Sequence, residues 1–81
     1  MKHGMKLELD KDADAVYVMI NPNDVAQTTK VDANRLIDYD ANGAVVGIEF
    51  LNISHGADLA DLPFHDKLVE LFDQHHLKQF A

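Results

Sequence analysis

Residues 38–51, DYDANGAVVGIEFL, carry the clearest structural signal in this chain of 81 residues. The dipeptide Asn42-Gly43 is typical of tight hairpin turns, because both residue types tolerate a positive φ. Residues 44–51 then place apolar side chains at every second position, which puts them on one face of a strand: Val46, Ile48 and Phe50. The stretch therefore predicts a β-hairpin whose second strand is buried on at least one face.

Three stretches before this hairpin are also predicted to be extended. Residues 5–9 alternate apolar and charged side chains, which is typical of a half-buried strand. Residues 15–20, AVYVMI, are apolar on both faces, as in a central strand that is covered on both sides. Residues 28–39 form a third extended stretch with an interruption near residues 32–34.

Beyond Pro63 the apolar spacing becomes that of a helix. One stripe recurs at i, i+4, i+7, i+8 and i+11: Phe64, Leu68, Leu71, Phe72 and His75. We expect Asp61 as the N-cap, with residues 54–62 as a linker before it. The chain is thus predicted to be an α+β domain, in which a small antiparallel sheet of three to four strands, about residues 5–53, carries a C-terminal amphipathic helix, about residues 63–79, on one face.

The composition excludes several classes of function. Lys and Arg number 7 against 14 Asp and Glu, for a net charge of −7 with histidine neutral. We expect no nucleic-acid partner, because a phosphate backbone requires clustered cations. Cysteine is absent, which excludes disulfides and thiolate sites, and the longest apolar run is too short to cross a membrane. We expect a single cytoplasmic domain over residues 5–81 after a flexible lead-in, residues 1–4.

The hairpin also matches the loop pattern of an EF-hand calcium site. The candidate ligands are Asp38, Asp40, Asn42 and Glu49. An EF-hand loop lies between two helices, however, and the segments on both sides of this loop lack helical spacing. We favour no metal site here, and calcium binding stays the alternative to an acidic β-hairpin.

Three blocks of the sequence resemble a known family. They are DKDADAVY at residues 10–17, VDAN at residues 31–34 and DYDANGAVVGIEFLNIS at residues 38–54. In this order and spacing they resemble the YuzE-like family, short bacterial proteins whose domain has no known function. The resemblance implies a compact antiparallel sheet with a helix, and it implies no reaction, substrate or cofactor.

No arrangement of residues predicts catalysis. Asp38, Asp40 and Glu49 are the carboxylates that acid–base chemistry would use, but spacing links no nucleophile or histidine to them. Ser54 lies outside any nucleophile-elbow pattern, and the histidines lack the i, i+4 spacing of helical metal ligands. We therefore expect neither an enzyme nor a cofactor.

The remaining features favour a non-enzymatic module for protein–protein interaction or regulation. Val16, Val18 and Ile20, or the opposite face of the same strand, form an apolar face that we expect to exceed what one short helix covers, which predicts a homodimer through this surface. The excess of acidic residues favours a basic protein partner. The chain would then neutralise that partner, as an antitoxin-like or regulatory subunit does. The alternative is a binder of divalent ions or small ligands built on the acidic hairpin, residues 38–49.

Overall fold

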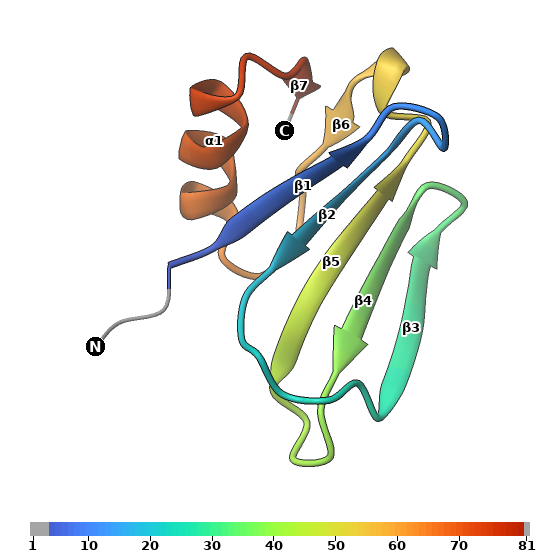
Figure 1. Ribbon diagram of the computed structural model, residues 1–81, viewed down its shortest axis with the longest axis vertical. Coiled ribbons are helices and arrows are strands. Elements are labelled where there is room, and N and C mark those ends of the chain that lie inside the picture. Colours follow the sequence, from blue (N-terminus) through green and yellow to red (C-terminus); the bar gives the residue numbers. More distant parts are fainter. Residues whose placement is uncertain (1–3, 81) are drawn as a thin grey trace.

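The computed structural model describes residues 4–80 and shows a five-stranded antiparallel sheet with one helix (Figure 1). The sheet strands are β1 (Lys6–Asp10), β2 (Ala15–Met19), β3 (Gln27–Asp32), β4 (Arg35–Tyr39) and β5 (Val45–Leu51). Their order across the sheet is β1-β2-β5-β4-β3, so β5 lies at the centre. The predicted hairpin is confirmed as β4 and β5.

The C-terminal part adds short elements around the helix. A 3₁₀ turn, η1 (Ile53–His55), leads to β6 (Ala57–Asp58), the helix α1 (His65–Gln74) and β7 (Gln79–Phe80). Strands β6 and β7 form a separate parallel pair, in which the Ala57 N–H donates to the Lys78 carbonyl over 2.9 Å. The predicted α+β class is thereby confirmed.

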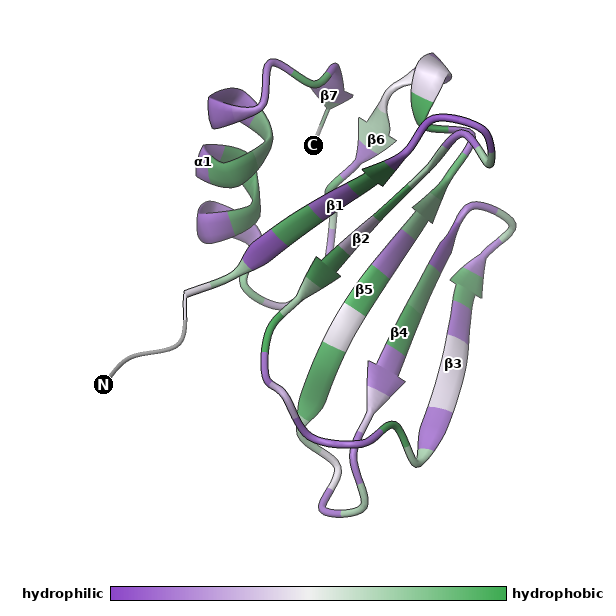
Figure 2. Ribbon diagram, viewed as in Figure 1, coloured by the Kyte–Doolittle hydropathy of each residue, from purple (hydrophilic) through white to green (hydrophobic). Residues whose placement is uncertain are grey.

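The register of β2 against β5 determines which side chains share a face. Val16 lies opposite Phe50 and Val18 opposite Ile48, and the Phe50 ring meets Phe72 of α1 edge to face with centroids 5.1 Å apart. The helix therefore covers this face. Alternating hydrophilic and hydrophobic residues along β1 in Figure 2 reflect the two different faces of the sheet. The core comprises Val16, Val18, Ile37, Ile48, Phe50, Ile53, Ala57, Leu59, Leu62, Leu68 and Phe72.

The sheet has five strands and not three to four, because residues 28–39 make two strands. The chain reverses between β3 and β4, where the Asn34 N–H donates to Asp32 Oδ1 over 2.9 Å. Such an Asx hydrogen bond stabilises a tight reversal without the help of glycine. The interruption seen in the sequence is thus a hairpin turn.

The helix is shorter than the predicted residues 63–79. Asp61 and Phe64 both have a positive φ, so the chain turns twice before the helix begins, and Phe64 is the N-cap in place of Asp61. At the other end His75 follows the last helical residue and is exposed. Phe64 is also 46% exposed, so these two members of the predicted stripe do not belong to the core.

The predicted linker, residues 54–62, is part of the folded core. It contains β6, and the side chains of Leu59 and Leu62 are buried against the sheet and helix. The predicted lead-in lies outside the described residues except for Gly4, which is exposed.

The predicted interface at Val16, Val18 and Ile20 was wrong. Val16 and Val18 have no exposed surface in the single chain, because Phe50, Leu68 and the C-terminal segment pack with them. Ile20 is partly buried against the same cluster. One short helix and the segment before it are together enough to cover this apolar face.

Candidate functional site

The face of the sheet opposite α1 is the candidate site. Its central row runs across β1, β2 and β5, where Glu8 lies opposite Tyr17 and Tyr17 lies opposite Glu49. Figure 1 looks onto this side, since the chain between β6 and α1 passes behind β1. We call this surface the open face and define it by Glu8, Tyr17, Thr28, Lys30, Asp38, Gly47 and Glu49.

Tyr17 reaches across the central strand of the open face. Its hydroxyl donates to Asp38 Oδ2 over 2.9 Å, although Tyr17 is on β2, Asp38 is on β4, and β5 lies between them. Gly47 of β5 makes this path free, because a Cβ at Gly47 would overlap the Tyr17 phenol. The Tyr17 ring of β2 thus occupies the space that a side chain at Gly47 of β5 would take.

Asp38 holds the ring in place through a small polar network. Its second oxygen, Oδ1, accepts a hydrogen bond from Thr28 Oγ1 over 2.6 Å. Burial and then the hydrogen bond and charge of Asp38, with a contribution from Glu49, raise the pKa of Tyr17 to about 12. Tyr17 therefore stays a neutral phenol, fixed in one orientation by its partner.

A shallow concavity of about 610 Å³ lies beside Tyr17, at the end of the sheet where β1 turns into β2. The charged residues that line it are four acids and one base: Glu8, Asp10, Asp12, Glu49 and Lys11. The nearby Lys6 ammonium lies 3.7 Å from the Glu8 carboxylate, but both side chains are mostly exposed. Exposed ion pairs of this kind contribute little to stability. Four of the five charged residues that line the concavity are acidic, so its net charge is negative.

The four candidate calcium ligands do not converge. Asp38 faces Tyr17 and Thr28, whereas Asp40 Oδ1 accepts the backbone N–H groups of Asn42 (2.9 Å) and Ala44 (3.0 Å). The structure shows no group of three His, Asp or Glu side chains among residues 4–80 that is placed to share a metal ion. The carboxylates of this hairpin instead stabilise the sheet and its turn.

Asp40 is the residue that organises this turn. Its Oδ2 accepts the Asn23 side-chain amide over 2.9 Å, and this bond, followed by the Ala44 backbone N–H, lowers the pKa of the Asp40 carboxyl. Since Asn23 belongs to the loop between β2 and β3, Asp40 connects that loop with the hairpin.

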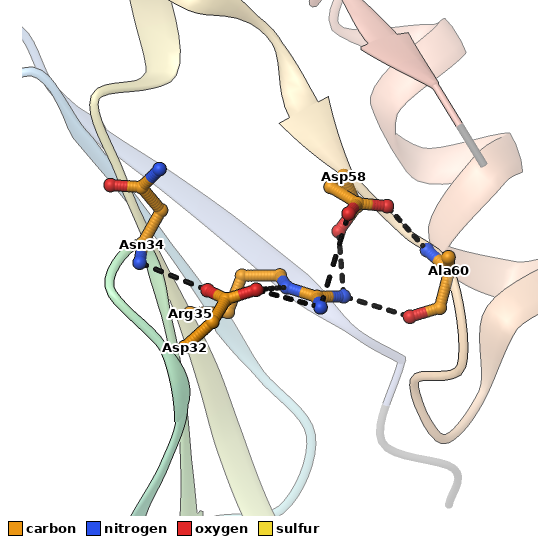
Figure 3. A network of polar contacts seen from close by, with 5 residues as sticks. All are labelled: Asp32, Asn34, Arg35, Asp58 and Ala60. Atoms are coloured by element: carbon orange, nitrogen blue, oxygen red, sulfur yellow. Dashed lines mark hydrogen bonds and ion pairs between the residues drawn. The ribbon is translucent and has the colours of Figure 1, made fainter.

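Arg35 forms a second polar cluster, on the covered side of the sheet (Figure 3). Its Nε and Nη2 donate to Asp32 Oδ2 at 2.9 and 2.8 Å, and its Nη1 donates to the carbonyls of Ala60 (2.7 Å) and Asp58 (3.2 Å). The hydrogen bond from Arg35 is the main cause that lowers the pKa of Asp32. Because the guanidinium is engaged by protein groups, this cluster joins β4 to the C-terminal segment.

The remaining candidates of the sequence have local roles. Ser54 Oγ donates to Asp14 Oδ2 over 2.8 Å, which ties η1 to the turn between β1 and β2. In that turn the Ala13 N–H donates to Asp10 Oδ1 over 3.1 Å, so the Asp10 carboxylate stabilises the reversal between β1 and β2. His75 Nδ1 lies 2.9 Å from the Leu71 carbonyl at the end of α1.

The sequence placed part of this site correctly. The sequence singled out Asp38 and Glu49, and the register of β4 and β5 places Asp38 opposite Gly47. The contact of Asp38 with Tyr17 and the role of Arg35 were missed. A glycine inside an otherwise apolar strand was the available signal, because such a glycine often marks a close approach by another group.

No helix among the described residues has the length and apolar character needed to cross a membrane.

Comparison with known proteins yields one family. The sequence profile of DUF2283, a protein family of unknown function, matches residues 6–54, which span the whole five-stranded sheet and most of η1. No curated protein and no solved structure matches the chain. The YuzE-like resemblance is thereby confirmed.

Proposed function

The chain belongs to the DUF2283 family, whose function is unknown, and we propose that it is a non-enzymatic interaction module that docks a basic partner protein on its open face. A regulatory subunit that neutralises a basic protein, as in an antitoxin-like role, would use such a surface.

The observation that carries this proposal is an uncovered sheet face with an acidic concavity at one end. In the described part of the chain, α1 packs on the opposite face, where Phe50 and Phe72 meet. The open face retains partly exposed Tyr17 and Glu49 at its centre. A sheet normally buries one face and leaves the other for solvent or a partner.

The charge of the chain supports a basic partner. The net charge of −7 attracts a cationic protein over distances of about one Debye length, roughly 8–10 Å at physiological salt. The attraction would raise the association rate and would weaken as salt is added. By the same reasoning, we propose no function that requires contact with a phosphate backbone.

Neither of the other two classes of function gains support from the geometry. The carboxylate of Asp38 is already bonded to Tyr17 and Thr28, and that of Asp40 to the turn. Binding a divalent ion at the hairpin would require these hydrogen bonds to break. A hydrolase would require a nucleophile beside a base, and Ser54 instead donates to Asp14.

Site-directed photo-crosslinking tests the proposal in cells that make the protein. A benzophenone amino acid replaces Lys30, which is exposed and lies in the same row as Glu49, or Lys67, which is exposed on α1. The two variants lose the same charge and differ in the face that carries the crosslinker. We expect a crosslinked basic protein from position 30 and none from position 67.

The yield of the crosslink should also fall as salt is added to the lysate before irradiation. An absence of any protein adduct at position 30, or equal adducts at both positions, would contradict docking on the open face.

A further inference from the structure

We infer that the open face recognises an arginine side chain of its partner, whose guanidinium lies against Tyr17 in the concavity that Glu8 and Glu49 also line. This inference rests on the proposed function and adds the chemistry of the contact.

The register places the two carboxylates on the strands that flank β2. Glu8 of β1 and Glu49 of β5 are the direct cross-strand partners of Tyr17. Directly opposed residues in antiparallel strands have Cβ atoms about 4.5–5.5 Å apart. Both carboxylates and Tyr17 line one concavity, so a group that enters it is within reach of all three side chains.

Tyr17 is prepared for this contact before a partner arrives. The bond to Asp38 and the space over Gly47 fix the ring across β5. An aromatic side chain that is already fixed loses little conformational freedom when it binds, so more of the contact energy appears as affinity. Because the Tyr17 hydroxyl already donates its hydrogen bond to Asp38, the ring is the part of Tyr17 that is left to contact a partner.

The combination of an aromatic ring with flanking carboxylates selects arginine. A guanidinium is planar, is more weakly hydrated than an ammonium group and stacks on aromatic rings, and its fork of N–H groups matches a carboxylate. Lysine offers the same charge without the plane or the fork. The site should therefore discriminate between two side chains of equal charge.

The concavity beside Tyr17 gives the side chain a path of entry. Asp10 and Asp12 line its outer part, at the turn between β1 and β2, and extend the negative charge away from the ring. A second acidic concavity of about 450 Å³, beside Asp24 and Asp40, has no aromatic residue in its lining. The inference therefore selects the first concavity, and the second serves as an internal comparison.

Two short peptides that differ only in Arg or Lys test the inference. Each carries two basic residues separated by glycines, with blocked ends, and is titrated into the ¹⁵N-labelled protein while the amide spectrum is followed. We expect shifts centred on Tyr17, Gly47 and Glu49. The arginine peptide should bind about two- to fivefold more tightly, because the guanidinium stacks on the ring and matches a carboxylate with its N–H fork, whereas an ammonium offers the charge alone.

Four variants assign the effect to the proposed groups. Glu49→Gln should weaken both peptides, whereas Glu70→Gln, the same change at an exposed position of α1, should weaken neither. Tyr17→Leu should abolish the preference for arginine. Tyr17→Phe keeps the ring and should keep the preference, which separates loss of the ring from loss of the hydrogen bond to Asp38.

The outcomes separate this inference from the proposal on which it rests. Equal affinity for the two peptides, or shifts centred on Asp24 and Asp40, overturns the arginine contact, while a crosslink at position 30 still supports docking on the open face. A failed crosslink at position 30 overturns the docking proposal itself.

Discussion

Gly47 keeps Tyr17 and Asp38 together, and its replacement tests this arrangement directly. In Gly47→Ala the new Cβ would overlap the phenol, so the ring must leave Asp38 and lose its hydrogen bond. We expect the free energy of unfolding to fall by about 1–3 kcal/mol, as for other overpacked sites, in urea denaturation.

The control for this prediction is the same change in a chain that carries Tyr17→Ser. Without the ring, alanine in a strand is favoured over glycine by roughly 0.5–1 kcal/mol, so the sign of the effect should reverse. An equal loss in both backgrounds would show that Tyr17 is not the cause.

The ionisation of Tyr17 predicts a fall in stability at high pH. Its pKa is about 12 in the folded protein, against about 10 for an ordinary tyrosine, so the unfolded chain releases the phenol proton first. Stability should be unaffected by this group below pH 10 and should decrease as the pH rises from 10 toward 12. Ultraviolet absorbance of tyrosinate in a Tyr39→Phe variant follows Tyr17 alone.

In that variant, Asp38→Asn should move the titration of Tyr17 to lower pH, because a negative charge beside the phenol is removed. A titration midpoint that stays unchanged in Asp38→Asn would contradict the assigned role of Asp38.

These contacts show where prediction from sequence ends. The apolar run at residues 15–20 and the extended stretch at residues 28–39 placed Tyr17 and Asp38 on strands, and the turn signal predicted the hairpin of β4 and β5. The bond between Tyr17 and Asp38 spans two strand pairings, β2 with β5 and β5 with β4. Such a contact depends on the registers of three strands together, and no local pattern contains that information.

Arg35 joins β4 to the C-terminal segment, and replacement by lysine tests this connection. A lysine ammonium keeps the charge but cannot reach Asp32 and the Ala60 carbonyl at once, because it lacks the planar fork. We expect a loss of about 1–3 kcal/mol and a Tm lower by about 4–8 °C per kcal/mol, measured by calorimetry.

Lys67→Arg is the matched control, because it exchanges lysine and arginine in the opposite direction at an exposed position of α1. No guanidinium hydrogen bonds are lost there, so the Tm should stay unchanged. A Tm of Arg35→Lys equal to that of the unmodified chain would show that the fork contributes nothing to the attachment of residues 58–60.

The strands were easier to predict than the segments between them. Long alternating or apolar runs identify β1, β2 and β5, because burial acts on every second residue of a strand. Strands β6 and β7 have two residues each, which is too short for any period. The start of α1 was missed because Phe64 adopts a positive φ that its residue type disfavours, which tertiary packing has to impose.

The complete core requires more than the part of the chain that matches the family. Residues 6–54 contribute the sheet, but the side chains that close its covered face come later: Leu59, Leu62, Leu68 and Phe72. This segment covers Val16 and Val18, so these residues cannot form the interface of a homodimer. The homodimer itself stays a prediction.

The order of strands in the sheet has a consequence for how the chain reaches its native state. Strands β3, β4 and β5 are neighbours in both the chain and the sheet, whereas β2 meets β5 only across the intervening hairpin. Short loops lose less chain entropy on closure than long ones. We expect the meander of β3, β4 and β5 to form early and to expose β5 as a free edge, which is protected only once the hairpin of β1 and β2 arrives.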